Sequence, residues 1–152
     1  MTTDTFITRV KAKHLRKEQV AVQFRMASIT CDHPPELNGD DLGPTPSEFL
    51  LAALACSICQ YVGRNAAKHK IPLESVEVVC DFAVGQEPST GPLGTVAFLS
   101  KAEARVEIKG DLTDEQFQLL KYFAEHCPVA ETLRRGVPPL ERVVLVKAKK
   151  KK

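Results

Sequence analysis

The fold of this chain is decided by the stretch SEFLLAALACSICQYV, residues 47–62, which is apolar nearly all the way round a helix. Ser47 can cap such a helix, and Glu48 in its first turn suits the positive end of the helix dipole. A helix without a polar face is normally covered by protein on every side. The stretch therefore predicts a buried central helix, which emerges into water beyond Gly63 and is stopped at 71–73.

Strands are predicted on the N-terminal side of this helix. Residues 5–12 and 18–25 alternate apolar and polar side chains, which is the period of half-buried strands. The segment 14–17 between them is typical of a hairpin connection, and a third short strand is predicted at 27–32. Residues 33–46 are rich in Pro, Gly and Asp and predict a loop.

The C-terminal half predicts two more strands, two helices and a last strand. Strand patterns lie at 74–84 and at roughly 95–109, and Thr113 begins a capping-box pattern for a helix through about 126. Pro128 suits the first turn of a short helix to about Arg135, and 140–146 supplies the last strand. The order β-β-β-α-β-β-α-α-β predicts an α+β fold with mainly antiparallel strands.

Length and composition indicate one globular domain. The 152 residues suffice for a single core, which we expect over 1–146, with 147–152 as a basic, disordered tail. The lysines of that tail carry more positive charge than the net +2 of the chain, so the rest of the chain is slightly acidic. A basic-tailed nucleic-acid binder rests on these lysines alone, and the absence of Trp with only 2 Tyr argues against a base-stacking surface.

The sequence shows no membrane or export segment. Its longest apolar stretch, Phe49 to Cys59, has 11 residues, well short of the roughly 20 that span a bilayer. The first residues lack the charged start and apolar core of a signal peptide, so a cytoplasmic location is predicted. Five cysteines without an export signal favour reduced thiols over a disulfide framework.

Cys56 and Cys59 form a C-x-x-C, but its position argues against two of its usual meanings. Thioredoxin-like pairs lie at a helix N-terminus, whereas this pair lies about ten residues into the predicted helix. A zinc site needs about four ligands, and the chain has no second C-x-x-C or H-x-x-x-H. We therefore predict neither metal nor cofactor. The remaining alternative is that both cysteines pack as small apolar side chains in the core.

Cys127 lies between one predicted helix and the next, which begins with Pro128. There its sulfur would meet unpaired backbone N–H groups and the positive end of a helix dipole, both of which favour a thiolate. A buried junction residue is the alternative. Cys31 and Cys80 lie in predicted strands and are interpreted as filler of the core or surface.

Three segments together resemble the OsmC/Ohr family of osmotically induced proteins and organic hydroperoxide reductases. They are GPTPSEFLLAALAC (43–56), IPLESVEV (71–78) and HCPVAETL (126–133). The resemblance implies an intertwined homodimer with a central helix from each subunit and sites at the interface. It also implies a two-cysteine peroxidase: one thiolate attacks the hydroperoxide and becomes a sulfenic acid, the second condenses with it, and a dithiol reduces the disulfide. A nearby Arg and Glu hold the thiolate in that family.

Carried onto this chain, the resemblance places the second cysteine at Cys127. The first usually lies 11 positions after the Pro that matches Pro46, and that position is Ser57. Cys56 is the nearest thiol and Cys59 the next, and one residue on a helix is about 100° of rotation. Glu48 stands one position later than the family glutamate. Arg16 falls in the right region for the arginine, with Arg9 and Arg25 as rivals.

Two functions follow from this resemblance. The first is a thiol-dependent peroxidase that reduces organic hydroperoxides through Cys56 and Cys127, with Glu48, Arg16 and Cys59 as further candidate site residues. Its partners would be a second copy of the chain, a small hydroperoxide and a dithiol reductant. The second is a non-catalytic, stress-related dimer that binds a small apolar ligand at its interface.

Overall fold

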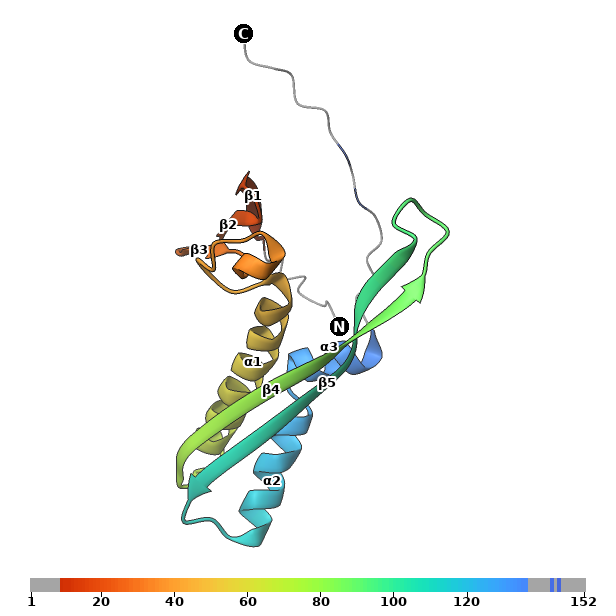
Figure 1. Cartoon of the computed structure of the whole chain (residues 1–152). Helices are drawn as coiled ribbons and strands as arrows, with labels where there is room; N and C mark the ends of the chain where they lie inside the picture. Colours follow the sequence, from red (N-terminus) through yellow and green to blue (C-terminus); the bar gives the residue numbers. More distant parts are fainter. Residues whose placement is uncertain (1–8, 137–142, 144, 146–152) are drawn as a thin grey trace, which may run out of the picture. The chain divides into compact units, whose positions relative to one another are not determined.

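The protein has the predicted order of elements through its last helix. A computed structural model describes residues 9–136, 143 and 145 (Figure 1). Their elements, in chain order, are β1 (Lys11–Arg16), β2 (Gln19–Gln23), β3 (Ser28–Cys31), a 3-10 helix η1 (Pro35–Leu37), α1 (Pro46–Lys68), β4 (Leu73–Pro88), β5 (Thr95–Gly110), α2 (Asp114–Glu125) and α3 (Pro128–Arg135). The α+β class with antiparallel strands is confirmed. The predicted last strand, at 140–146, and the lysine tail fall almost wholly outside the described residues.

The chain divides into two compact units. The first unit is Met1–Ala55 with Val79–Arg105, and the second is Cys56–Val78 with Val106–Lys152. In the first, β1, β2 and β3 form an antiparallel sheet in that order, with Val22 opposite both Ala12 and Ile29 (Figure 1). Strands β4 and β5 form a separate two-stranded sheet.

The first hairpin differs from its prediction. The strand β1 continues through His14 and Arg16, where a connection was expected, and the turn lies at 17–18. Lys17 takes a left-handed backbone with φ 45°. Both Arg16 and Lys17 form ion pairs with Asp40, which is more than twenty residues away in the sequence. This tertiary contact holds the turn at 17–18, whereas the local pattern had placed the connection at 14–17.

The helix α1 begins earlier than predicted, and its cap is Thr45 rather than Ser47. Thr45 Oγ1 accepts the Glu48 N–H at 3.3 Å, while the Glu48 carboxylate accepts the Thr45 N–H at 2.7 Å. This reciprocal pair is a capping box, and Pro46 occupies the first helical position, where its missing N–H costs nothing. The prediction of a Ser47 cap is therefore wrong, because the threonine before Pro46 already fills that role.

Within one chain, α1 is buried along one stripe and not on every side. Leu54, Ile58, Val62 and Ala66 are buried at a spacing of four residues. Other apolar positions of the helix are open, and Leu50 is 42% exposed. The prediction of all-round burial thus fails for the single chain, because its own elements cover only one side of the helix.

The second unit joins the C-terminal part of α1 to α2 and α3. Phe123 of α2 contacts Tyr61 edge-on at 6.1 Å between ring centroids and lies 5.5 Å from the His69 ring. Leu120 and Cys127 are fully buried. The predicted capping box at Thr113 is present, and Gly136 ends α3 with a φ of 61°, a conformation that glycine adopts without steric cost.

The helices described here are all too short or too polar to cross a membrane. This finding agrees with the absence of a sufficiently long apolar stretch in the sequence. The predicted cytoplasmic location stays a prediction.

Candidate thiol site

Cys127 is the most enclosed thiol of the second unit. It occupies the N-cap of α3, with φ −66° and ψ 153°, and its side chain is 0% exposed. Its sulfur accepts the backbone N–H of Ala130 at 3.5 Å. The prediction that this cysteine meets the unpaired N–H groups of the following helix is confirmed. The side chain of the neighbouring His126 is engaged with Tyr122 instead of Cys127. Its imidazole stacks on the Tyr122 ring at 4.1 Å, and its Nδ1 lies 2.9 Å from the Tyr122 carbonyl oxygen.

The side chain of Ser57 joins α1 to the start of α3 by a hydrogen bond. Its Oγ accepts the backbone N–H of Val129 at 3.4 Å. Val129 lies two residues after Cys127, so the turn of α1 that carries Ser57 faces the segment that carries Cys127. The hydrogen bond to that segment is thus made by the hydroxyl of Ser57, which stands where the family resemblance implies the first cysteine.

The two thiols that flank Ser57 differ in their access to water. Cys56 is exposed and Cys59 is half-buried. Burial raises the pKa of the Cys59 thiol, and the neighbouring Cys56 raises it further. Of the two, Cys56 is the thiol that a dissolved molecule reaches directly. About 100° of helix rotation separates it from Ser57.

Cys31 belongs to the first unit and shows the environment of a core residue. It is 6% exposed at the end of β3. Burial raises the pKa of its thiol, and the nearby carboxylates of Asp32 and Glu48 raise it further. Its interpretation as core filler agrees with these surroundings. In the part of the chain that the structure describes, no three His, Cys, Asp or Glu side chains gather closely enough to hold a metal ion.

Arg16 and Glu48 both belong to the first unit and are both engaged there. The Arg16 guanidinium donates to Asp40 Oδ2 at 3.0 Å. Glu48 accepts from Thr45, whose N–H and hydroxyl lower the pKa of that carboxyl, against a smaller upward effect of desolvation. Arg9 and Arg25 are exposed and make no ion pair within the described ranges, so Arg16 is the one of these three candidate arginines that has a defined partner.

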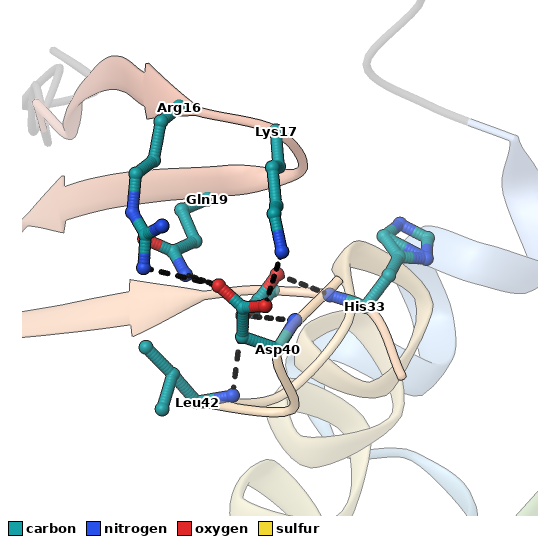
Figure 2. Close-up of polar contacts among 7 residues, drawn as sticks. Arg16, Lys17, Gln19, His33, Asp40 and Leu42 are labelled. Carbon is teal, nitrogen blue, oxygen red and sulfur yellow. Dashed lines mark hydrogen bonds and ion pairs between the residues drawn. The ribbon is translucent and has the colours of Figure 1, made fainter. Parts of the chain in front are cut away.

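A buried carboxylate organises the loop that leads into α1. Asp32 is 0% exposed, and it accepts the backbone N–H groups of His33, Asp40 and Leu42 at 2.8, 3.1 and 3.2 Å. Desolvation raises the pKa of Asp32, but these N–H groups and the Gln19 side chain together lower it by more. Figure 2 labels His33, Asp40 and Leu42, the three residues whose backbone N–H groups make these bonds.

A second carboxylate ties the same loop to the first hairpin. Asp40 accepts from Arg16, Lys17 and Gln19, as the side chains converging on it in Figure 2 show. This pair of aspartates was missed from the sequence. The amides that Asp32 holds lie as many as 10 residues later, beyond the reach of any local turn pattern. The available signal was that Asp32 precedes, and Asp40 lies in, a loop rich in Pro and Gly.

Comparison with known proteins identifies the family of this chain. The sequence profile of the family described as OsmC-like protein matches residues 39–140, which is well over half of the chain. The chain belongs to the OsmC-like family. No protein of curated function matches the OsmC-like chain in sequence.

Solved structures similar to this OsmC-like protein share its fold. An organic hydroperoxide resistance protein OsmC from Legionella pneumophila is 22% identical, with a TM-score of 0.62 over 87% of this chain and 92% of its own. An OsmC-like protein from Mycoplasma pneumoniae is 20% identical, with a TM-score of 0.66 over 89% and 91%. An organic hydroperoxide resistance protein from Elizabethkingia anophelis is 18% identical, with a TM-score of 0.63 over 88% and 91%. At these identities the likeness establishes the fold alone.

Proposed function

We propose that this OsmC-like protein is a thiol-dependent peroxidase that reduces organic hydroperoxides, with Cys56 and Cys127 as its redox pair. One observation carries the proposal: the hydrogen bond from Val129 N–H to Ser57 Oγ holds the Cys56 turn of α1 against the segment that begins at Cys127. The two thiols also suit different steps, because Cys56 is exposed to solvent, where a hydroperoxide can reach it, and Cys127 is buried. Family relatives named for hydroperoxide resistance support the substrate class.

The chemistry balances with one hydroperoxide and one dithiol per turnover. The Cys56 thiolate attacks the O–O bond, so an S–O bond forms, the alkoxide leaves and takes up a proton, and Cys56 becomes a sulfenic acid. The Cys127 thiol then attacks that sulfur, which forms the disulfide and releases water. An external dithiol reduces the disulfide by two exchange steps and restores both thiols.

Arg16 and Glu48 are proposed as the groups that hold the Cys56 thiolate, as the family resemblance implies. Each has another partner in its own unit, Asp40 for Arg16 and Thr45 for Glu48. Arg16 therefore has to leave Asp40 before it can pair with a sulfur. Because the ion pair between Arg16 and Asp40 is exposed, the free energy needed to break it is small.

We further propose that the protein acts as a homodimer. The open apolar side of α1, with Leu50 at 42% exposure, is one support. The hairpin of β4 and β5 is another, since Val79, Val84 and Phe98 are 54%, 59% and 44% exposed. Apolar surface of this extent is usual where a second chain packs. Light scattering coupled to size exclusion is expected to give twice the mass of the chain at micromolar concentration, and a monomer mass would contradict the dimer.

The peroxidase is tested by turnover. The purified protein, given excess dithiothreitol and cumene hydroperoxide, is expected to consume the hydroperoxide in amounts many times its own, with cumyl alcohol as the product. Consumption no faster than that of dithiothreitol alone would overturn the proposal. Prior alkylation of the protein with iodoacetamide is the control, because it removes the thiols and leaves the rest of the chain intact.

A second function is favoured by one specific observation. The side chain that bonds to the Cys127 segment is Ser57, and a hydroxyl can neither reduce a peroxide nor form a disulfide. In this alternative the protein is a non-catalytic dimer that binds a small apolar ligand. Ser57→Cys separates the two: gain of turnover by an otherwise inert protein favours the binder, whereas turnover already present in the native protein favours the peroxidase.

A further inference from the structure

Cys59 has no role in the chemistry above, although it is the third thiol of the same unit. It lies three residues after Cys56 on α1, and side chains at that spacing share one face of a helix. It is half-buried beside an exposed partner. By contrast, Ser57 faces the segment that carries Cys127. Cys56 is about 100° away from Ser57 around the helix, so its sulfur must be redirected before it can reach Cys127.

We propose that Cys59 is a second resolving thiol, which condenses with oxidised Cys56 to form a bridge within one turn of α1. This inference rests on the proposed peroxidase function. Its chemistry needs no further reactant: the Cys59 sulfur attacks the sulfenic sulfur of Cys56, the S–S bond forms, and hydroxide leaves with the thiol proton as water. The hydroperoxide supplies the oxidation, and an external dithiol reverses it.

The helix must tighten locally for this bridge to form. In an ideal α-helix, Cβ atoms three residues apart are about 5–6 Å from each other, whereas a disulfide needs about 3.5–4.5 Å. A turn with 3-10 geometry brings positions i and i+3 directly above one another, so tightening one turn supplies the approach. A bridge formed in this way is strained and hence easier to reduce, which suits a catalytic intermediate that a dithiol must open.

The environments of the two thiols also determine which of them is oxidised first and which then attacks. Burial and the neighbouring Cys56 both raise the pKa of Cys59, so this thiol is the less reactive of the pair toward hydroperoxide. Once Cys56 is a neutral sulfenic acid, its part in raising that pKa is relieved. Cys59 then becomes the nearest nucleophile on the same helix, and the exposed side of the bridge at Cys56 stays open to a reductant.

The test uses Cys127→Ser, which removes the partner implied by the family. Serine is a preferred N-cap residue and keeps an acceptor for the Ala130 N–H, so this variant is expected to fold. After one equivalent of cumene hydroperoxide and thiol alkylation, the peptide spanning residues 26–64 is expected to carry a bridge between Cys56 and Cys59, with Cys31 alkylated. Adding Cys59→Ser should remove the bridge and lengthen the life of the Cys56 sulfenic acid by at least roughly tenfold, because the partner held on the same helix is lost.

The outcomes separate this inference from the function on which it rests. A lasting sulfenic acid on Cys56 in Cys127→Ser, with Cys59 still alkylated, would overturn the inference and leave the peroxidase standing. No oxidation of any thiol, in this variant and in the native protein, would overturn both. Cys80→Ser, which alters a thiol outside the site, is the matched control and should bridge as the native protein does.

Discussion

Cys56→Ser is expected to abolish dithiol-dependent reduction of cumene hydroperoxide, with a loss in turnover of at least about 1,000-fold, as is typical when a catalytic nucleophile is removed. The serine hydroxyl is not a nucleophile for the O–O bond at neutral pH. Neither remaining thiol of the unit can replace Cys56 efficiently, because Cys59 has a raised pKa and Cys127 is 0% exposed. The measurement is the steady-state rate of hydroperoxide loss at saturating dithiothreitol.

Two further variants make this result specific. Cys80→Ser should keep the native rate, since it removes a thiol that has no role in the proposed chemistry. Cys59→Ser should slow turnover by far less than Cys56→Ser does, because Cys127 still resolves the oxidised Cys56. Turnover of Cys56→Ser within a few-fold of the Cys80→Ser control would show that the nucleophile is another residue.

Asp32→Ala is expected to lower the melting temperature by about 5–10 °C, a large effect for one residue of a loop. The substitution leaves the N–H groups of His33, Asp40 and Leu42 without their common acceptor in a place closed to water. The loop 33–44 then loses the group that shapes it ahead of α1. Thermal melts followed by circular dichroism at fixed protein concentration measure the change.

The same carboxylate predicts how stability depends on pH. Its pKa in the folded protein is lowered, so its contribution is complete above the ordinary Asp value of about 3.9 and is lost as the pH falls through the lower folded value. Asp32→Ala should therefore show a weaker loss of stability than the native protein as the pH falls below about 4. Asp40→Asn is the matched control: Asp40 forms exposed ion pairs, and its effect should be small. An Asp32→Ala protein that melts like Asp40→Asn would contradict this role.

The parts of the fold that were predictable from sequence are those set by local pattern. The capping box at Thr113, Pro128 at the start of α3 and Gly136 at its end each lie within one helical turn of the feature they determine. The position of Cys127 at a helix N-cap followed from the same local rules. That Ser57 stands at the position of the family's first cysteine came from the family resemblance and not from local pattern.

The parts that were missed depend on residues far apart in the chain. The end of β1 is held by Asp40, and the loop before α1 is shaped by Asp32, through partners that no short-range pattern reveals. The burial of α1 within one chain was overestimated, because the apolar content of a helix does not show whether its own chain or a second chain covers it. Choosing Ser47 as the cap was a different kind of error, since Thr45 with Glu48 fits the capping-box spacing and could have been read from the sequence.

The proposed chemistry requires that hydroperoxide oxidises Cys56 before any other thiol. The most direct measurement exposes the reduced protein to less than one equivalent of cumene hydroperoxide in the presence of dimedone, which captures sulfenic acids, and locates the adduct by peptide mass spectrometry. We expect an adduct on Cys56, most abundant when Cys59 and Cys127 are both replaced by serine, because neither thiol can then consume the sulfenic acid. An adduct confined to Cys59 or Cys127, or hydroperoxide left unconsumed with every thiol unmodified, would contradict it.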